Sequence, residues 1–231
     1  MPFHRPLGHR PRCSVFRVET GRAEAFSDGV FAIAITLLIL AVGIDQALAK
    51  GDLKDQLLHL WPAYIAYAVS FITIGIMWVN HHAVFRHFAR VDRPLLLLNI
   101  LLLMFIAFTP FPTRVVAEHA HSDSDRKAAA LLYGITMTCT AIFFFAVWIY
   151  GSRRLLRPDA DPREVSGITR SYLPGAPTYA TATLIALVSP IASLIIFGVI
   201  ALFYALSSSF FGRDETLSTT ERTASAGEPS S

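Results

Sequence analysis

The sequence RAEAFSDGVFAIAITLLILAVGI, residues 22–44, joins a charged, hydroxyl-bearing start to an unbroken apolar run. A helix needs about 20 apolar residues to cross a bilayer, and the run from residue 25 supplies them. Asp28 lies where this run begins, and an ionisable group at that depth favours a functional role because its desolvation is costly. Ser27 and Asp28 can equally cap the first helical turn, since their side-chain oxygens accept from unpaired amides there. The local chemistry leaves both interpretations open.

The composition extends the membrane interpretation to the whole chain. Its 231 residues are 53% hydrophobic and 16% charged, with a mean hydropathy of +0.48. This is too apolar for a water-soluble domain, so we expect an all-α, polytopic membrane protein. The net charge of +3 does not indicate nucleic-acid binding, because the basic residues are spread over the segments that flank the apolar runs. Cys13 and Cys139 offer no disulfide framework.

Six transmembrane helices are predicted from the apolar runs. They cover residues 25–44, 61–80, 95–116, 128–150, 172–188 and 190–206. Trp61 and Pro62 open the second, while Pro110 and Pro112 should kink or unwind the end of the third, because proline lacks an amide donor. The last apolar stretch is too long for one crossing, and Pro190 marks its natural break. Residues 81–94 and 151–170 are predicted to be basic connectors.

The distribution of basic residues predicts the orientation. With six spans, 15 of the 20 Lys and Arg residues fall on the side that holds both termini. The positive-inside rule then places both termini in the cytoplasm. We expect a cytoplasmic tail at 1–20, a membrane domain at 21–211 and a disordered cytoplasmic tail at 212–231. No removable signal peptide is expected, because the first apolar run begins late and no small-residue cleavage site follows it.

The motif Arg-x-x-x-Phe-Ser-Asp at the start of the first helix resembles the signature of the TMEM175 family of potassium channels. Its positions here are Arg22, Phe26, Ser27 and Asp28, and the similarity continues through VFAIAITLL at 30–38. The resemblance implies a potassium-permeable cation channel in the cell membrane, without enzymatic activity and with no cofactor besides the permeant K⁺. Chains with one six-helix unit resemble the bacterial form, which assembles as a homotetramer. The implied partners are therefore further copies of this chain, the bilayer and potassium ions.

One face of the first predicted helix carries Ile33, Thr36, Leu37 and Leu40, spaced i, i+3, i+4 and i+7. From the periodicity alone, such a face packs on neighbouring helices or lipid, and Thr36 bonds to a carbonyl one turn earlier. In TMEM175-like channels the first helices line the pore with aliphatic rings and a threonine layer, without a carbonyl filter loop. The resemblance implies that these four residues line the pore. An apolar ring that excludes water acts as a gate, because a bare cation cannot recover its hydration energy there.

A second polar group lies at the end of the second predicted helix: Trp78, Asn80, His81 and His82, followed by His87. A metal site is disfavoured, because adjacent helical residues point about 100° apart and no cysteine or carboxylate cluster is near. We expect an interfacial hydrogen-bond network instead.

In that network, Asn80 and a histidine should reach Ser27, Asp28 or Arg22 on the first helix. The resemblance implies that polar residues of the second and third helices brace the Phe-Ser-Asp motif, and we assign this bracing role to Arg22 and Asp28. An ion-attracting vestibule is the lesser alternative for them. Asn99 in the third span predicts an ordinary interhelical hydrogen bond.

Two other functions fit the residues. A secondary carrier is one, because Pro-interrupted helices with intramembrane polar residues suit alternating access, although the sequence contains no recognisable internal repeat. A non-transporting scaffold is the other, in which Arg22 and Asp28 only anchor a helix bundle. No nucleophile–base pair, phosphate-binding glycine loop or zinc motif occurs in the sequence, so no catalytic residue is assigned.

Overall fold

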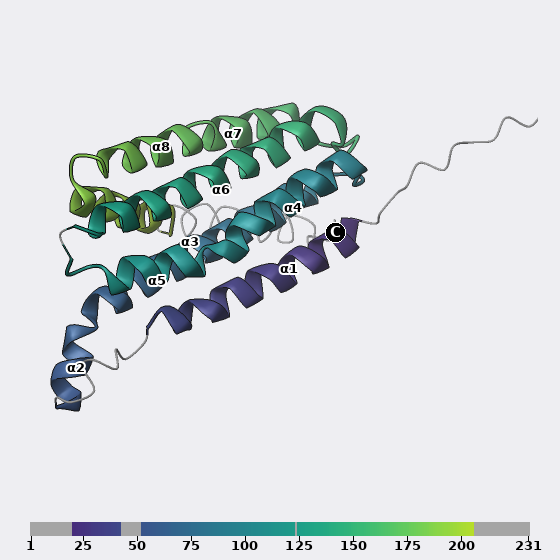
Figure 1. Ribbon diagram of the computed structural model, residues 1–231. Coiled ribbons are helices and arrows are strands. Elements are labelled where there is room, and N and C mark those ends of the chain that lie inside the picture. Colours follow the sequence, from purple (N-terminus) through teal and green to yellow (C-terminus); the bar gives the residue numbers. More distant parts are fainter. Residues whose placement is uncertain (1–19, 43–51, 123, 206–231) are drawn as a thin grey trace, which may run out of the picture.

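The computed structural model describes residues 20–42, 52–122 and 124–205, and these residues form a bundle of helices (Figure 1). In chain order the elements are α1 (Thr20–Leu37), η1 (Leu38–Ala41), α2 (Leu53–His59), α3 (Trp61–Arg86), α4 (Arg93–Phe108), α5 (Pro110–Glu118), α6 (Arg126–Arg154), α7 (Pro162–Tyr172), α8 (Gly175–Ile185) and a final helix, Pro190–Ala205. An isolated β-bridge joins Phe88 and Leu156 in the connectors. Almost all of the two predicted tails lies outside the described residues.

Four segments of the described chain are long and apolar enough to cross a membrane. They are Thr20–Leu40, Trp61–Arg86, Arg93–Glu118 and Arg126–Arg154, and they correspond to the first four predicted spans. The apolar stretch after them divides before Pro190, as predicted, since α8 ends at Ile185 and the final helix begins at Pro190. Both resulting helices are shorter than the other four spans.

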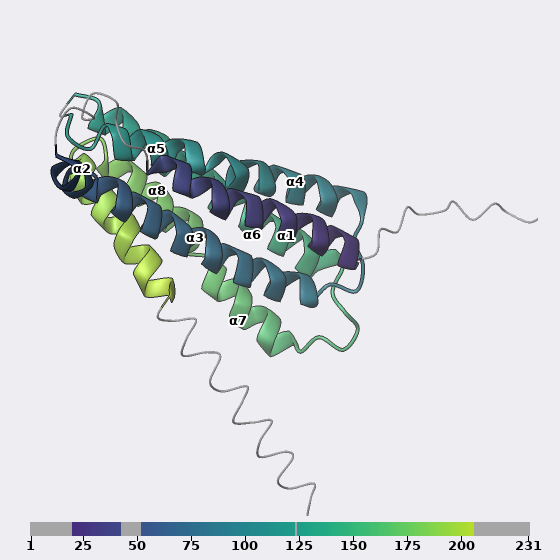
Figure 2. The ribbon, with the colours of Figure 1, turned by 90° about the horizontal axis from the view of Figure 1, so that it is seen from below.

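Helix α1 lies along one side of the bundle, where it packs against α3 and α4 while η1 packs against α5 (Figures 1 and 2). Helix α6 contacts α4 on one side and α8 on the other. Helices α7 and α8 follow one another along the length of α6 (Figure 1). One face of α1 is therefore covered by its neighbours, while the opposite face is left open.

Both predicted connectors contain helix, which corrects the sequence reading. Helix α3 continues to Arg86 rather than ending at Asn80. The segment 151–170 begins inside α6 and then forms α7, where the Asp161 side chain accepts a hydrogen bond from the Arg163 amide at 2.8 Å, beside a proline in the first turn. Val165, Ile168 and Tyr172 pack from α7 onto the core at helical spacing.

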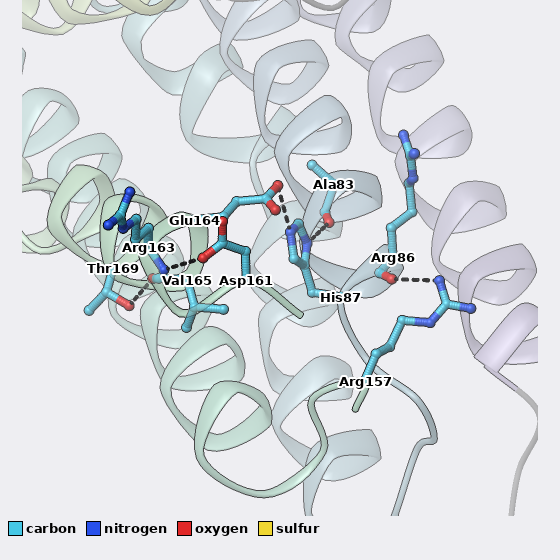
Figure 3. Close-up of polar contacts among 9 residues, drawn as sticks. All are labelled: Ala83, Arg86, His87, Arg157, Asp161, Arg163, Glu164, Val165 and Thr169. Atoms are coloured by element: carbon cyan, nitrogen blue, oxygen red, sulfur yellow. Dashed lines mark hydrogen bonds and ion pairs between the residues drawn. The ribbon is translucent and has the colours of Figure 1, made fainter. Parts of the chain in front are cut away.

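Helix α7 is held against the end of α3 by polar contacts (Figure 3). His87 Nδ1 lies 2.7 Å from the Ala83 carbonyl oxygen, and its Nε2 lies 3.2 Å from Glu164 Oε1. The Arg157 amide donates to the His87 carbonyl at 3.0 Å, and the Arg157 guanidinium donates to the Arg86 carbonyl at 3.4 Å. These contacts fix the connector after α6 to the turn between α3 and α4.

The third span is divided at Thr109 into α4 and α5 but is not unwound there. Thr109, between α4 and α5, keeps helical dihedral angles of φ −53° and ψ −36°. Its hydroxyl donates to the Phe105 carbonyl at 3.0 Å, and the Thr113 hydroxyl donates to the Thr109 carbonyl at 2.9 Å. Pro110 and Pro112 remove two amide donors here, and these hydroxyls supply donors next to them. The predicted interruption of the third span is present as this division at Thr109, whereas the backbone there is not unwound.

Replacing Gly151 by Ala should destabilise the protein, because a Cβ on Gly151 would overlap the Phe88 ring. That ring is buried, so the overlap cannot be relieved by rotation into solvent, and overpacking of this kind costs about 1–3 kcal/mol. Gly167→Ala on α7 is the matched control, because no atom lies within 4 Å of the added Cβ. Thermal unfolding in detergent should give a lower Tm for Gly151→Ala than for wild type or the control. Equal Tm values would contradict the close approach of Phe88.

Candidate functional site

Helix α1 has one buried face and one exposed face. The buried residues are Ala23, Ser27, Phe31 and Ala34, with Leu38 continuing the same face into η1. Three of the four residues predicted to line a pore are large aliphatic side chains with high exposure: Ile33 at 61%, Leu37 at 41% and Leu40 at 62%. Thr36 is also exposed, and its hydroxyl donates to the Ile33 carbonyl at 2.9 Å. The described protomer thus presents these four side chains outward.

The exposed stripe extends back to the beginning of the helix. Arg22, Phe26 and Gly29 precede Ile33 at steps of three or four residues, so they lie on the same face. All three are exposed. The motif is therefore divided between two faces, with Arg22 and Phe26 on the open stripe and Ser27 directed into the bundle.

A buried chain of hydrogen bonds joins α3, α4 and α1. His81 Nε2 lies 2.9 Å from Asn99 Oδ1, and Asn99 Nδ2 donates to Ser27 Oγ at 2.9 Å. Ser27 Oγ in turn donates to the Ala23 carbonyl at 2.8 Å. Because an amide oxygen can only accept, His81 Nε2 must carry the proton. All three side chains are at most 2% exposed, so the network fixes how α1 sits on its neighbours.

Aromatic rings hold His81 in this network. The Phe31 ring of α1 meets the imidazole edge-on at a centroid distance of 5.4 Å, and Phe85 stacks on it at 4.3 Å. The two contacts restrict rotation of the imidazole and keep Nε2 directed at Asn99.

Two further contacts join α1 to α3 at the surface. Trp78 Nε1 donates to Asp28 Oδ1 at 2.8 Å, and His82 Nδ1 lies 3.7 Å from Glu24 Oε2. The predicted neighbourhood of Asp28 with the end of the second helix is thus present, with Trp78 as the donor. The Arg22 side chain makes no hydrogen bond or ion pair with any other described residue.

The structure differs from the sequence reading at Asn80. This residue lines a cavity between α3, α6 and α8 instead of reaching the motif on α1. Asn99, predicted only to make an ordinary interhelical bond, is the residue that contacts Ser27. The sequence signal was a single amide in the run LLLLNILLL at 95–103, which marks a buried polar contact without naming its partner.

The three histidines of this region have separate surroundings. His81 lies in the buried network, His82 faces Glu24 and His87 faces Glu164. Across residues 20–42, 52–122 and 124–205, no three His, Cys, Asp or Glu side chains are grouped so that they could hold a metal ion.

Comparison with known proteins links this arrangement to one family. The family model described as endosomal/lysosomal potassium channel TMEM175 matches residues 22–110. A potassium channel of Streptomyces collinus is 44% identical over 191 residues, covering 82% of this chain and 93% of that protein. A potassium channel of Chamaesiphon minutus is 43% identical over 195 residues, covering 83% of this chain and 96% of that protein.

A solved structure agrees with the sequence relatives. The crystal structure of a lysosomal potassium-selective channel TMEM175 homologue from Chamaesiphon minutus superposes with a TM-score of 0.75 at 40% identity, covering 82% of this chain and 97% of that chain. The family match at 22–110 contains every residue of the buried network described above.

Proposed function

The chain belongs to the TMEM175 family, which consists of ion channels and not of enzymes, and from this premise we propose that it is a potassium-permeable cation channel of a cell membrane. Its long apolar helices make it a multi-pass membrane protein. Its relatives in Streptomyces and Chamaesiphon are named potassium channels, which supports potassium as the permeant ion.

The observation that carries the proposal is the exposed aliphatic stripe on α1. Four copies of the chain around a common axis would turn Ile33, Leu37 and Leu40 into stacked apolar rings, with Thr36 as a polar layer between them. Apolar rings of this kind gate by excluding water, and the permeation path then needs no filter of backbone carbonyls. The homotetramer and the constriction are both part of this proposal.

The proposed topology has six crossings with both termini in the cytoplasm. The α7–α8 pair, which lies along α6, serves as the fifth crossing, and Pro190–Ala205 serves as the sixth (Figure 1). The polar α7 would occupy the membrane interface, where its arginines agree with the positive-inside rule.

The hydrogen bonds around the motif support a bracing role. The buried chain through Asn99 and the Trp78–Asp28 contact both attach α1 to the rest of the protomer, on the side away from the stripe. We assign the brace to Ser27 and Asp28. Arg22, on the open stripe, is better suited to the vestibule of the pore than to the brace.

Asp28→Ala should reduce assembly more than it changes ion selectivity. The carboxylate accepts from Trp78 and faces away from the stripe, so its loss loosens α1 without altering the proposed pore surface. Trp78→Phe is the companion variant, because it removes the same hydrogen bond and keeps an aromatic ring. Native mass spectrometry in detergent should detect fewer oligomers for both. A normal oligomer with a changed potassium-to-sodium permeability ratio would contradict the brace.

Reconstitution into liposomes tests the proposed channel against its alternatives. In a potassium gradient, a channel should give currents that reverse near the potassium equilibrium potential. Turnover limited to tens of ions per second would favour a carrier instead, and the absence of any flux would favour a scaffold. A carrier must complete a conformational cycle for each transport event, and this cycle limits its rate. Conduction through an open pore requires no such cycle.

A further inference from the structure

A small cavity, partly open at the surface of the described bundle, lies between α3, α6, α8 and the final helix. Its volume is about 80 Å³. Most of its wall is apolar and includes Met77 of α3, with Ala141 and Phe144 of α6. No residue of α1 lines it, so it is separate from the proposed pore.

Five side chains with hydrogen-bonding groups line this cavity: Thr73, Asn80, Tyr172, Tyr179 and Tyr204. They come from four different helices, and Tyr179 is only 9% exposed. The Thr73 hydroxyl donates to the Val69 carbonyl at 2.8 Å, and within the part of the chain that the structure describes none of the other four makes a side-chain hydrogen bond. Their polar atoms are open to the cavity, since no fully buried side-chain nitrogen or oxygen among the described residues lacks a partner. The wall therefore offers a hydrogen-bonding end to whatever occupies the space.

We propose that this cavity binds a small uncharged molecule with one hydrogen-bonding head and a short apolar tail, of the class of the short-chain alcohols. The head bonds to Asn80 and the tail lies on the apolar wall. No Asp, Glu, Lys, Arg or His lines the cavity, so a charged ligand would lose its hydration without gaining a counter-ion.

The size of the cavity limits the ligand. One water-sized position takes roughly 10–15 Å³, so the space holds roughly five to eight of them. This corresponds to a molecule of about five non-hydrogen atoms, the size of butan-1-ol. Asn80 lies on α3 between Trp78 and His81, which both contact α1. A ligand at Asn80 therefore acts on the helix that holds α1.

Photolabelling with diazirine-bearing alcohols tests the proposal. The full-length protein in lipid nanodiscs is irradiated with 3-azibutanol or 3-azioctanol, and the labelled residues are mapped by mass spectrometry. The butanol probe should label Tyr179 and Tyr204, and excess butan-1-ol should suppress this labelling. The octanol probe should label these two residues several-fold less than the butanol probe, although it partitions more strongly into lipid.

Variants separate the site from the surrounding bilayer. Asn80→Leu removes the hydrogen-bonding head and should reduce labelling by the butanol probe about fivefold, while Ala141→Leu fills the space and should reduce it at least as much. Ile142→Leu is the matched control, because this neighbouring α6 residue is exposed and does not line the cavity. It should leave labelling unchanged.

Two outcomes would overturn the proposal. One is labelling of Tyr179 and Tyr204 that does not change in Asn80→Leu or Ala141→Leu. The other is labelling that rises from the butanol probe to the octanol probe, as partition into lipid predicts. Neither measurement depends on ion flux. The cavity proposal can therefore be rejected without rejecting the proposed channel function.

Discussion

Replacing Ile33 or Leu37 by Ala should raise potassium flux through the reconstituted protein by about tenfold or more. Each side chain is large, aliphatic and exposed on the α1 stripe, where the proposed rings exclude water. Truncation to a methyl group widens the ring and lets water enter, which lowers the cost of moving a cation through it. A tenfold increase requires the barrier to fall by only about 1.4 kcal/mol, a small fraction of the hydration energy of an ion.

The matched control is Ile135→Ala. Ile135 is 55% exposed like the stripe residues, but it lies on α6, which is not one of the helices that pack against α1. Flux should be measured from potassium-loaded liposomes at equal protein content, together with single-channel conductance. If both stripe variants conduct like wild type, or if Ile135→Ala conducts as much as they do, α1 does not line the pore.

The first part of the chain was the most predictable from sequence. Residues 22–40 combine a distinctive polar motif with an apolar run of spanning length, and the helical period alone placed Ile33, Thr36, Leu37 and Leu40 on one face. The break before Pro190 followed from proline chemistry, since proline cannot continue a preceding helix without loss of a hydrogen bond. In both cases the residues that determine the structure are close together in the sequence.

The partners within the site were less predictable. The helix α4 is apolar nearly all round, so its sequence does not reveal which face meets α1 and which meets α6. For the same reason, no sequence rule could decide whether Asn80 or Asn99 contacts Ser27. That choice depends on how α3 and α4 are rotated about their own axes. Packing between the helices determines this rotation, and the sequence pattern does not reveal it.

The helix α7 was missed for a different reason. The seven residues between α6 and α7, together with the arginines of α7, resemble a basic loop, and high mean hydropathy marks only long apolar runs. The local signal was present in Asp161-Pro162, a helix-starting pair, and in the spacing of Val165, Ile168 and Tyr172. A short amphipathic helix at the membrane interface is recognised in a sequence by the helical spacing of its apolar residues, not by its mean hydropathy.

Asn99→Leu should destabilise the protein strongly, by about 1–3 kcal/mol, although leucine has a similar volume. An interhelical hydrogen bond in a membrane protein is worth about 0.6 kcal/mol on average, which alone would predict a smaller effect. Loss of Asn99, however, breaks two bonds and leaves the His81 Nε2–H buried without an acceptor. An unpaired buried donor carries its full desolvation cost, and this term dominates.

The double variant His81→Phe/Asn99→Leu distinguishes this explanation from simple loss of packing. Phenylalanine approximates the shape of the imidazole between Phe31 and Phe85 but has no donor to leave unpaired. The double variant should therefore recover most of the Tm that Asn99→Leu loses in detergent, because replacing both partners by apolar groups can be nearly neutral. Asn80→Leu is the matched control, since Asn80 lies outside the network. If the double variant instead unfolds at a Tm lowered by the sum of the two single effects, the directed chain from His81 to Ser27 does not hold α1 in place.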